Sequence, residues 1–178
     1  MFEDGRSKRV VLAVHCIHNQ NARIDKCAYF PGVMGEIAQM LADSGVGIVQ
    51  LPCPELMHLG LDREAHGGQQ IGIREALLAK EGRKACAEMA RQAVCQVEEY
   101  RKHGFEVLGV IGNDGSPACG VERTWYHGAG AGAGEGAFIR ALREELKARQ
   151  IELPFVAVAD HEWEERAAAI GELLEPRA

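Results

Sequence analysis

The sequence predicts an α/β fold, a single-domain three-layer αβα sandwich with a parallel, flavodoxin/Rossmann-like sheet of about four strands. Two observations predict it. Apolar runs of about five residues alternate with longer segments of helical period, which is the pattern of βαβ units. The chain of 178 residues is also 47% hydrophobic, which suffices to bury both faces of one sheet within a single domain spanning 1–178.

Four apolar runs are the expected strands, near 9–14, 46–51, 105–111 and 155–159. In the flavodoxin-like order 2-1-3-4, the first strand lies between the second and the third. Four segments with apolar residues at helical spacing are the expected helices, at 33–44, 83–103, 135–150 and 162–174. Cys86 and Cys95 fall on or near the apolar face of the second helix, where we expect both to pack in the core.

Two stretches interrupt this alternation, 54–82 and 112–136. Each follows the carboxyl end of an expected strand, so we expect both to border the same crevice. The first is longer than an ordinary connection and contains a short helical segment at 74–79. The second contains a glycine-rich run from Gly128 to Gly136. Because Glu135 would repel a phosphate there, we expect a flexible lid rather than a phosphate cradle.

Three cysteines each follow the end of an expected strand. Cys16 follows the first, Cys53 follows the second, and Cys119 lies in the loop after the third. Ligands of open α/β sheets bind outside the carboxyl ends of the strands, so the three thiols can converge on one point. Three thiolates around one point indicate a metal or an iron–sulfur cluster. The alternative is that each is a small buried hydrophobic residue, as free cysteines often are.

Other side chains offer competing sites. Cys27, in the loop after the first strand, could be a fourth ligand, a resolving thiol or a residue without a role. Mixed cysteine and histidine ligands would suit tetrahedral zinc, although no pair has the usual zinc spacing. The histidines that could approach the crevice are His15, His18, His58, His66, His127 and His161.

Composition and charge exclude several classes of partner. The 20 Lys and Arg are scattered, and with 26 Asp and Glu they give a net charge of −6, which argues against nucleic acid. No run of about 18 apolar residues and no apolar leader is present, so we expect a cytoplasmic protein without a membrane partner. Cytoplasmic thiols are kept reduced, which favours metal binding or catalysis for the six cysteines. A homodimer is left open.

Three motifs together resemble the thiouracil desulfidase family. The chain has a Cys shortly after its first strand at Cys16, then Cys53-Pro54-Glu55, then Ser116-Pro117-Ala118-Cys119-Gly120. The stretch 59–63 resembles a further family motif more loosely. The resemblance implies a [4Fe-4S] cluster held by Cys16, Cys53 and Cys119, with one iron open to the sulfur of a small thiolated substrate. Around Cys16 the sequence departs from the family, which indicates a divergent branch.

The resemblance also implies an activity, the non-redox removal of sulfur by hydrolysis of a C–S bond. Glu55 and Ser116 lie close enough in the chain to the cluster cysteines to be the catalytic residues that move protons. Alternatively, Glu55 caps a helix and Ser116 starts a turn. Asn113 and Asp114 are weaker candidates for hydrogen bonds to substrate. Two rival functions stay open, a non-catalytic iron–sulfur carrier or sensor, and a zinc hydrolase with Cys and His ligands.

Overall fold

The structure is a computed structural model that describes residues 2–63, 72–159 and 162–175. Within these residues, one sheet consists of β1 (Arg9–Ala13), β2 (Gly47–Gln50), β3 (Glu106–Asn113) and β6 (Phe155–Val158). Its order is β2-β1-β3-β6 and every neighbouring pair is parallel. Both the fold class and the predicted 2-1-3-4 order are therefore confirmed, and β1 lies between β2 and β3.

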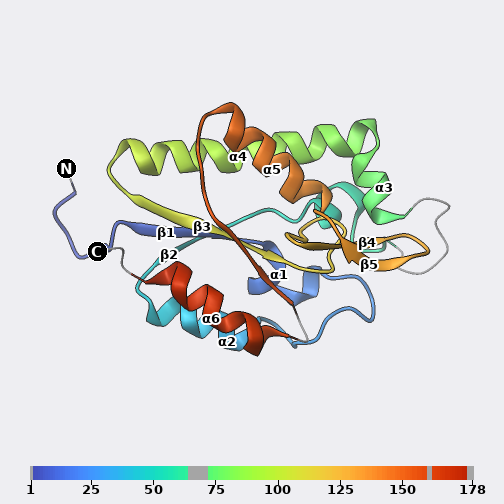
Figure 1. Cartoon of the computed structure of the whole chain (residues 1–178), viewed down its shortest axis with the longest axis horizontal. Helices are drawn as coiled ribbons and strands as arrows, with labels where there is room; N and C mark the ends of the chain where they lie inside the picture. The colour runs from blue at the N-terminus through green and yellow to red at the C-terminus, as the bar shows by residue number, and fades with distance from the viewer. Residues whose placement is uncertain (1, 64–71, 160–161, 176–178) are drawn as a thin grey trace.

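Helices cover both faces of the sheet (Figure 1). On one side lie α4 (Lys80–Lys102) and α5 (Ala137–Ala148), with the short α3 (Ile73–Leu78) leading into α4. On the other side lie α2 (Gly35–Asp43) and α6 (Trp163–Leu174). All five occupy segments where the sequence predicts helix, and their ends differ from the predicted ones by at most three residues. No helix in the described part of the chain is long and apolar enough to cross a membrane.

One hydrophobic core fills the space between the layers. Its fully buried members come from the central strands and from the inward stripes of the helices, among them Val11, Leu12, Ile111, Phe138 and Leu142. Burying a side chain of this size contributes about 1.5–3 kcal/mol. Because the core holds both central strands rigidly, the loops at their carboxyl ends start from fixed positions.

Cys86 and Cys95 occupy opposite faces of α4. Cys86 is buried, as expected, but Cys95 is exposed, so the expectation of a core role for Cys95 is wrong. Nine residues separate the two, which is two and a half turns at about 3.6 residues per turn. That spacing necessarily places them about 180° apart. Arg149 donates to the Cys95 sulfur at 3.7 Å on the outer surface.

The glycine-rich run differs most from its prediction, because it contains a strand instead of a flexible lid. β5 (Gly130–Ala133) pairs antiparallel with β4 (Arg123–Tyr126) in a separate hairpin. The small residues let the Tyr126 ring lie against this strand, and its hydroxyl donates to the carbonyl of Ala133 at 3.0 Å. Alternating Gly and Ala carry no large apolar side chains, so the period that marks strands in a sequence is missing here.

Candidate metal centre

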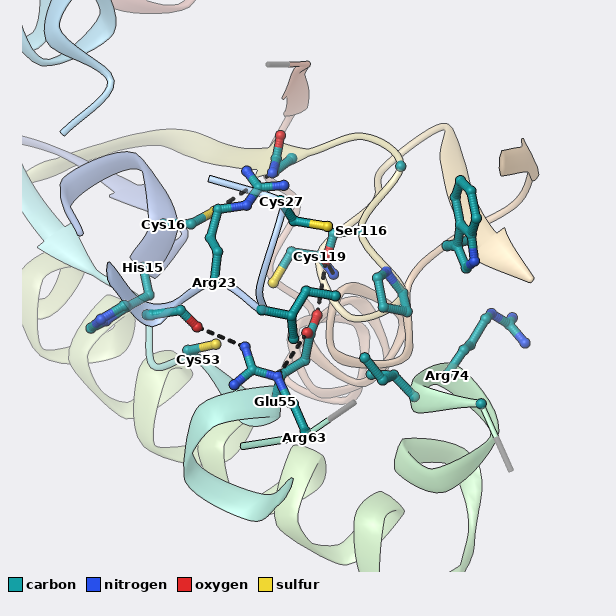
Figure 2. A pocket seen from close by; sticks show the side chains of 18 of the residues that line it. His15, Cys16, Arg23, Cys27, Cys53, Glu55, Arg63, Arg74, Ser116 and Cys119 are labelled. Carbon is teal, nitrogen blue, oxygen red and sulfur yellow. Dashed lines mark hydrogen bonds and ion pairs between the residues drawn. The ribbon is translucent and has the colours of Figure 1, made fainter. Parts of the chain in front are cut away.

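The three strand-end cysteines line one cavity of about 190 Å³, together with Cys27. Figure 2 shows the four sulfurs around this cavity, with Glu55, Arg63 and Ser116 on its wall. The cavity is below the roughly 300–1,000 Å³ of sites for drug-sized ligands, which favours a small occupant. In Figure 1 the elements that border it, α1, α3 and the β4–β5 hairpin, gather at one end of the sheet.

Cys16 lies in α1 (His15–His18), which begins directly where the β1 ladder ends. Val14 N–H still donates to the Ile111 carbonyl at 3.0 Å, so the position of α1 is set by β3. The amide of Asn113, at the end of β3, has two orientations beside Cys16. One donates to the Cys16 sulfur at 3.6 Å. The other donates to Val158 at 3.2 Å and accepts from Arg23 at 3.0 Å, and we adopt it because it satisfies both neighbours.

Cys53 precedes a short π-helical turn, Glu55–Leu59. Pro54 begins this turn, where its missing N–H costs no hydrogen bond. The Leu56 N–H donates to the Cys53 sulfur at 3.4 Å. Burial, and next the charge of Glu55, raise the pKa of Cys53, and the Leu56 N–H opposes part of that shift. Backbone N–H groups on sulfur also tune iron–sulfur clusters.

Cys119 is held in a turn that starts at Ser116. The Ser116 hydroxyl accepts hydrogen bonds from the N–H groups of Ala118 at 3.2 Å and Cys119 at 2.9 Å, so the turn-forming role of Ser116 is present. The first N–H groups of α5 donate to the carbonyls of Pro117 and Ala118 at 3.0 and 2.9 Å. The start of α5 is therefore satisfied by the cysteine turn and offers no phosphate cradle.

The donor set fits an iron–sulfur cluster. Burial, and next the neighbouring thiols of Cys16 and Cys53, raise the pKa of Cys119 well above its ordinary value. A thiolate in this place therefore requires positive charge beside it, which a bound metal supplies. Thiolates are also the ligands that clusters take. Cys16, Cys53 and Cys119 would hold such a group.

A single metal ion finds no comparable site among the residues the structure describes. No group of three or more His, Cys, Asp or Glu side chains there is arranged to hold one ion. Four thiolates around one zinc stand within about 4 Å of each other, given bonds of about 2.3 Å. The irons of a cubane occupy separate corners, so its ligands stand farther apart. The two kinds of site therefore differ in the spacing that they require of their thiolates.

Few of the histidines reach the cavity. His15 and His127 line it. His18 does not, and its Nε2 atom has no hydrogen-bond partner within the described chain. His58 is exposed and lies outside the cavity lining. The remaining two candidates, His66 and His161, lie outside the described residues.

Glu55 and Ser116 meet at the cavity wall. The Ser116 hydroxyl donates to Glu55 Oε1 at 3.3 Å, and Arg63 Nε donates to Glu55 Oε2 at 3.2 Å. Arg63 is 4% exposed and also donates to the carbonyls of Gly60 at 2.6 Å and Ala22 at 2.7 Å. The carboxylate is thus fixed at both oxygens, its charge is balanced by Arg63, and it lines the same cavity as the cysteines.

The weaker sequence candidates have other positions. Asp114 is absent from the cavity lining, and its Oδ1 accepts from the N–H groups of Val121, Glu122 and Arg123 at 2.9, 2.9 and 3.2 Å. It orders the loop after the cysteine turn, so a hydrogen bond to substrate from Asp114 is not supported. Asn113 does line the cavity.

Several cavity residues have no motif in the sequence that marks them. Arg23, Arg74 and Trp125 line the cavity, and buried Gln20 supports it from behind. Only Arg63 had a signal, because the stretch 59–63 loosely resembles a family motif. Arg74 lies at the start of the short helix α3, and the others belong to turns and a hairpin without apolar period. Nothing in the pattern therefore separates them from ordinary surface residues.

The protein is therefore an α/β protein with a four-stranded parallel sheet and a cavity that four cysteines line. Comparison with known proteins shows its family. The chain matches none of the protein-family models. It is 31% identical over 116 residues to the uncharacterized protein MJ0003 of Methanocaldococcus jannaschii. The matched residues cover 65% of this chain and 70% of that protein. The chain belongs to the family of that protein.

A solved structure shares the fold. It is described as a [4Fe-4S]-dependent thiouracil desulfidase, TudS, and it aligns over 92% of this chain and 99% of its own with a TM-score of 0.51. The two sequences are 20% identical, so the likeness is one of fold. The sheet and the helices on both its faces therefore match a fold that, in the solved protein, accompanies a cluster.

Proposed function

We propose that this protein is an iron–sulfur-dependent, non-redox desulfidase that removes sulfur from a small thiolated compound, with Cys16, Cys53 and Cys119 holding a [4Fe-4S] cluster. The observation that carries the proposal is one cavity that brings these three thiols together with the Glu55–Ser116 pair. The name of the structural neighbour supports both the cofactor and the reaction type.

The residues of this chain account for the proton movements. When bound through three cysteines, a [4Fe-4S] cluster supplies a Lewis-acidic iron that takes a soft sulfur ligand. Glu55 takes a proton from the water that attacks the carbon bearing the sulfur, and later returns it to the departing sulfur. The Ser116 hydroxyl orients Oε1 of Glu55 for this transfer. The thiocarbonyl group and water give a carbonyl group and hydrogen sulfide, and no electrons are transferred.

Trp125 points to the shape of the substrate. It is 50% exposed, although it lines the cavity. An exposed indole at the wall of a small cavity offers a flat apolar face, on which a planar heterocycle can stack. Arg74 also lines the cavity, and its guanidinium carbon lies 4.9 Å from the centroid of the Tyr126 ring, on the same hairpin as Trp125. We therefore propose a thiolated heterocycle, similar to a thiolated pyrimidine, as the substrate class.

Iron and sulfide analysis of anaerobically purified variants tests the ligands. Cys16→Ser, Cys53→Ser and Cys119→Ser should each lose most of the iron. The matched controls are Cys86→Ala and Cys95→Ala. The Cys86 thiol is buried in the core and the Cys95 thiol is exposed, and neither lines the cavity. Full cluster content in Cys53→Ser would contradict the proposal. A zinc content near one per chain without iron would favour the zinc hydrolase instead.

Glu55→Gln tests the chemistry separately from cluster assembly. General acid–base groups contribute about 10²–10⁴-fold, so hydrogen sulfide release from 4-thiouracil should fall by that order while iron content stays constant. If iron is lost together with activity, Glu55 is structural or a ligand. If a cluster is present but no thiolated heterocycle is desulfurated by the parent protein, a carrier or sensor role replaces the enzyme.

A further inference from the structure

Cys27 belongs to the same cavity as the three strand-end cysteines. It is half-buried and lines the cavity, and Figure 2 shows its side chain directed into it. Unlike the other three, it is carried by a turn and not by a strand end. The Cys27 N–H donates to the Ile24 carbonyl at 3.1 Å, and Lys26 has a positive φ of 62°, which together close this turn.

Buried hydrogen bonds tie this turn to the rest of the site. Gln20 is 1% exposed, and its side chain donates to the Cys16 carbonyl at 2.8 Å and accepts from Tyr29 N–H at 3.3 Å. Arg63 donates to the Ala22 carbonyl at 2.7 Å on the other side of the turn. The segment that carries Cys27 is therefore clamped to the backbone of Cys16 at one end and to the Glu55–Arg63 pair at the other.

The cavity thus contains as many thiols as a cubane has irons. Resting on the proposed function, we infer that Cys27 is a fourth, exchangeable ligand, which occupies the remaining iron in the absence of substrate and yields that place to the substrate sulfur. The strand-end cysteines are fixed by the sheet, whereas Cys27 is carried by a turn outside the sheet, so its withdrawal from the iron would disturb the fold least.

The exchange balances without an oxidant or a reductant. The iron–sulfur bond to Cys27 would break and the iron–sulfur bond to the substrate would form. The proton that the substrate carries on sulfur in its thiol tautomer would pass to the Cys27 thiolate. A ligand attached through a short segment competes at an effective concentration of about millimolar order. Cys27 therefore protects the cluster from small thiols below that concentration and still gives way to a substrate that the cavity binds well.

The first test titrates the reduced, cluster-loaded protein with 2-mercaptoethanol and follows the electron paramagnetic resonance spectrum. Cys27→Ala should retain its iron and bind 2-mercaptoethanol about tenfold or more tightly than the parent protein, because no internal thiolate competes. The matched control is Cys95→Ala, which lies on the outer surface of α4 and should titrate as the parent does. Equal affinities in all three proteins, at equal iron content, would overturn the inference.

A second measurement counts the ligands in the unmodified protein. The β-CH₂ protons of cluster cysteines have hyperfine-shifted nuclear magnetic resonance signals, and the parent should show four such cysteines where Cys27→Ala shows three. Three in both proteins would overturn the inference and leave the proposed function intact. A parent protein that takes up no iron would overturn both. A Cys27 disulfide found in the loaded protein would assign Cys27 as a resolving thiol and refute its role as ligand.

Discussion

Replacing Arg63 by Met should destabilise the protein more than any change at an exposed ion pair. The Arg63 side chain is 1% exposed, and that of its partner Glu55 is 11% exposed. Besides Glu55, the guanidinium satisfies the carbonyls of Gly60 and Ala22. Arg63→Met keeps the apolar stem and removes all three interactions. A carboxylate and two carbonyls would then be left in a site with little access to water.

The expected loss follows from that burial. Removing one partner of a buried ion pair costs about 3–5 kcal/mol, because the other charge stays desolvated. Total stabilities are about 5–15 kcal/mol, so the change is a large fraction of the whole. In a chain of this size, 1 kcal/mol corresponds to about 2–4 °C in Tm, which gives a decrease of about 6–20 °C.

Urea unfolding at matched iron content measures the effect, and Arg91→Met is its control. Arg91 and Glu88 lie closer, at 2.6 Å, but their side chains are 51% and 50% exposed, so water screens that pair and its loss should change the stability little. The double variant Glu55→Gln/Arg63→Met should recover part of the stability, because the isolated charge is gone. Equal losses for Arg63→Met and Arg91→Met, or no recovery in the double variant, would refute the reasoning.

Three further predictions concern residues around the site. Gly136→Ala should lower both the Tm and the iron content, because a Cβ there would lie 2.6 Å from Cys119 N. Its control is Gly171→Ala on α6, where a Cβ meets open space and should raise helix stability by up to about 1 kcal/mol. Asp114→Ala should cost about 2–4 kcal/mol in urea unfolding through its three backbone hydrogen bonds, and Asp114→Asn, which keeps an acceptor, should lose less. Trp125→Ala should raise KM for 4-thiouracil about 2–10-fold with kcat unchanged, and an unchanged KM would dismiss stacking on the indole.

The sheet and its helices were predictable because they follow hydrophobic period. The four apolar runs became the four strands, and the stripes of α2, α4 and α5 face the core as their spacing indicates. The order of the strands came from topological rules that leave few alternatives. From that order alone it followed that Cys16, Cys53 and Cys119 start from neighbouring strand ends, and all three do line one cavity.

The walls of the cavity were not predictable in the same way. α1, the π-helical turn at Glu55 and the β4–β5 hairpin are short and lack an apolar period, so tertiary contacts decide their form. The hairpin shows this most clearly, because Gly and Ala alternate where a strand normally carries larger apolar residues. The prediction that Cys95 packs in the core was wrong for a different reason. Its spacing from Cys86 already placed it on the outer face of α4, so its angular position was the decisive signal.

This division suggests how the two parts of the site respond to change. The strand-end thiols are fixed by a rigid sheet, so substitutions that alter them or the turn around Cys119 should change cluster content first. Arg23, Cys27 and Trp125 lie on turns and a hairpin at the same cavity. Under the proposed function, substitutions there should change which sulfur compounds the site accepts while the iron content stays constant. Comparing iron content with substrate range across these two groups of variants therefore separates the scaffold of the site from its selectivity.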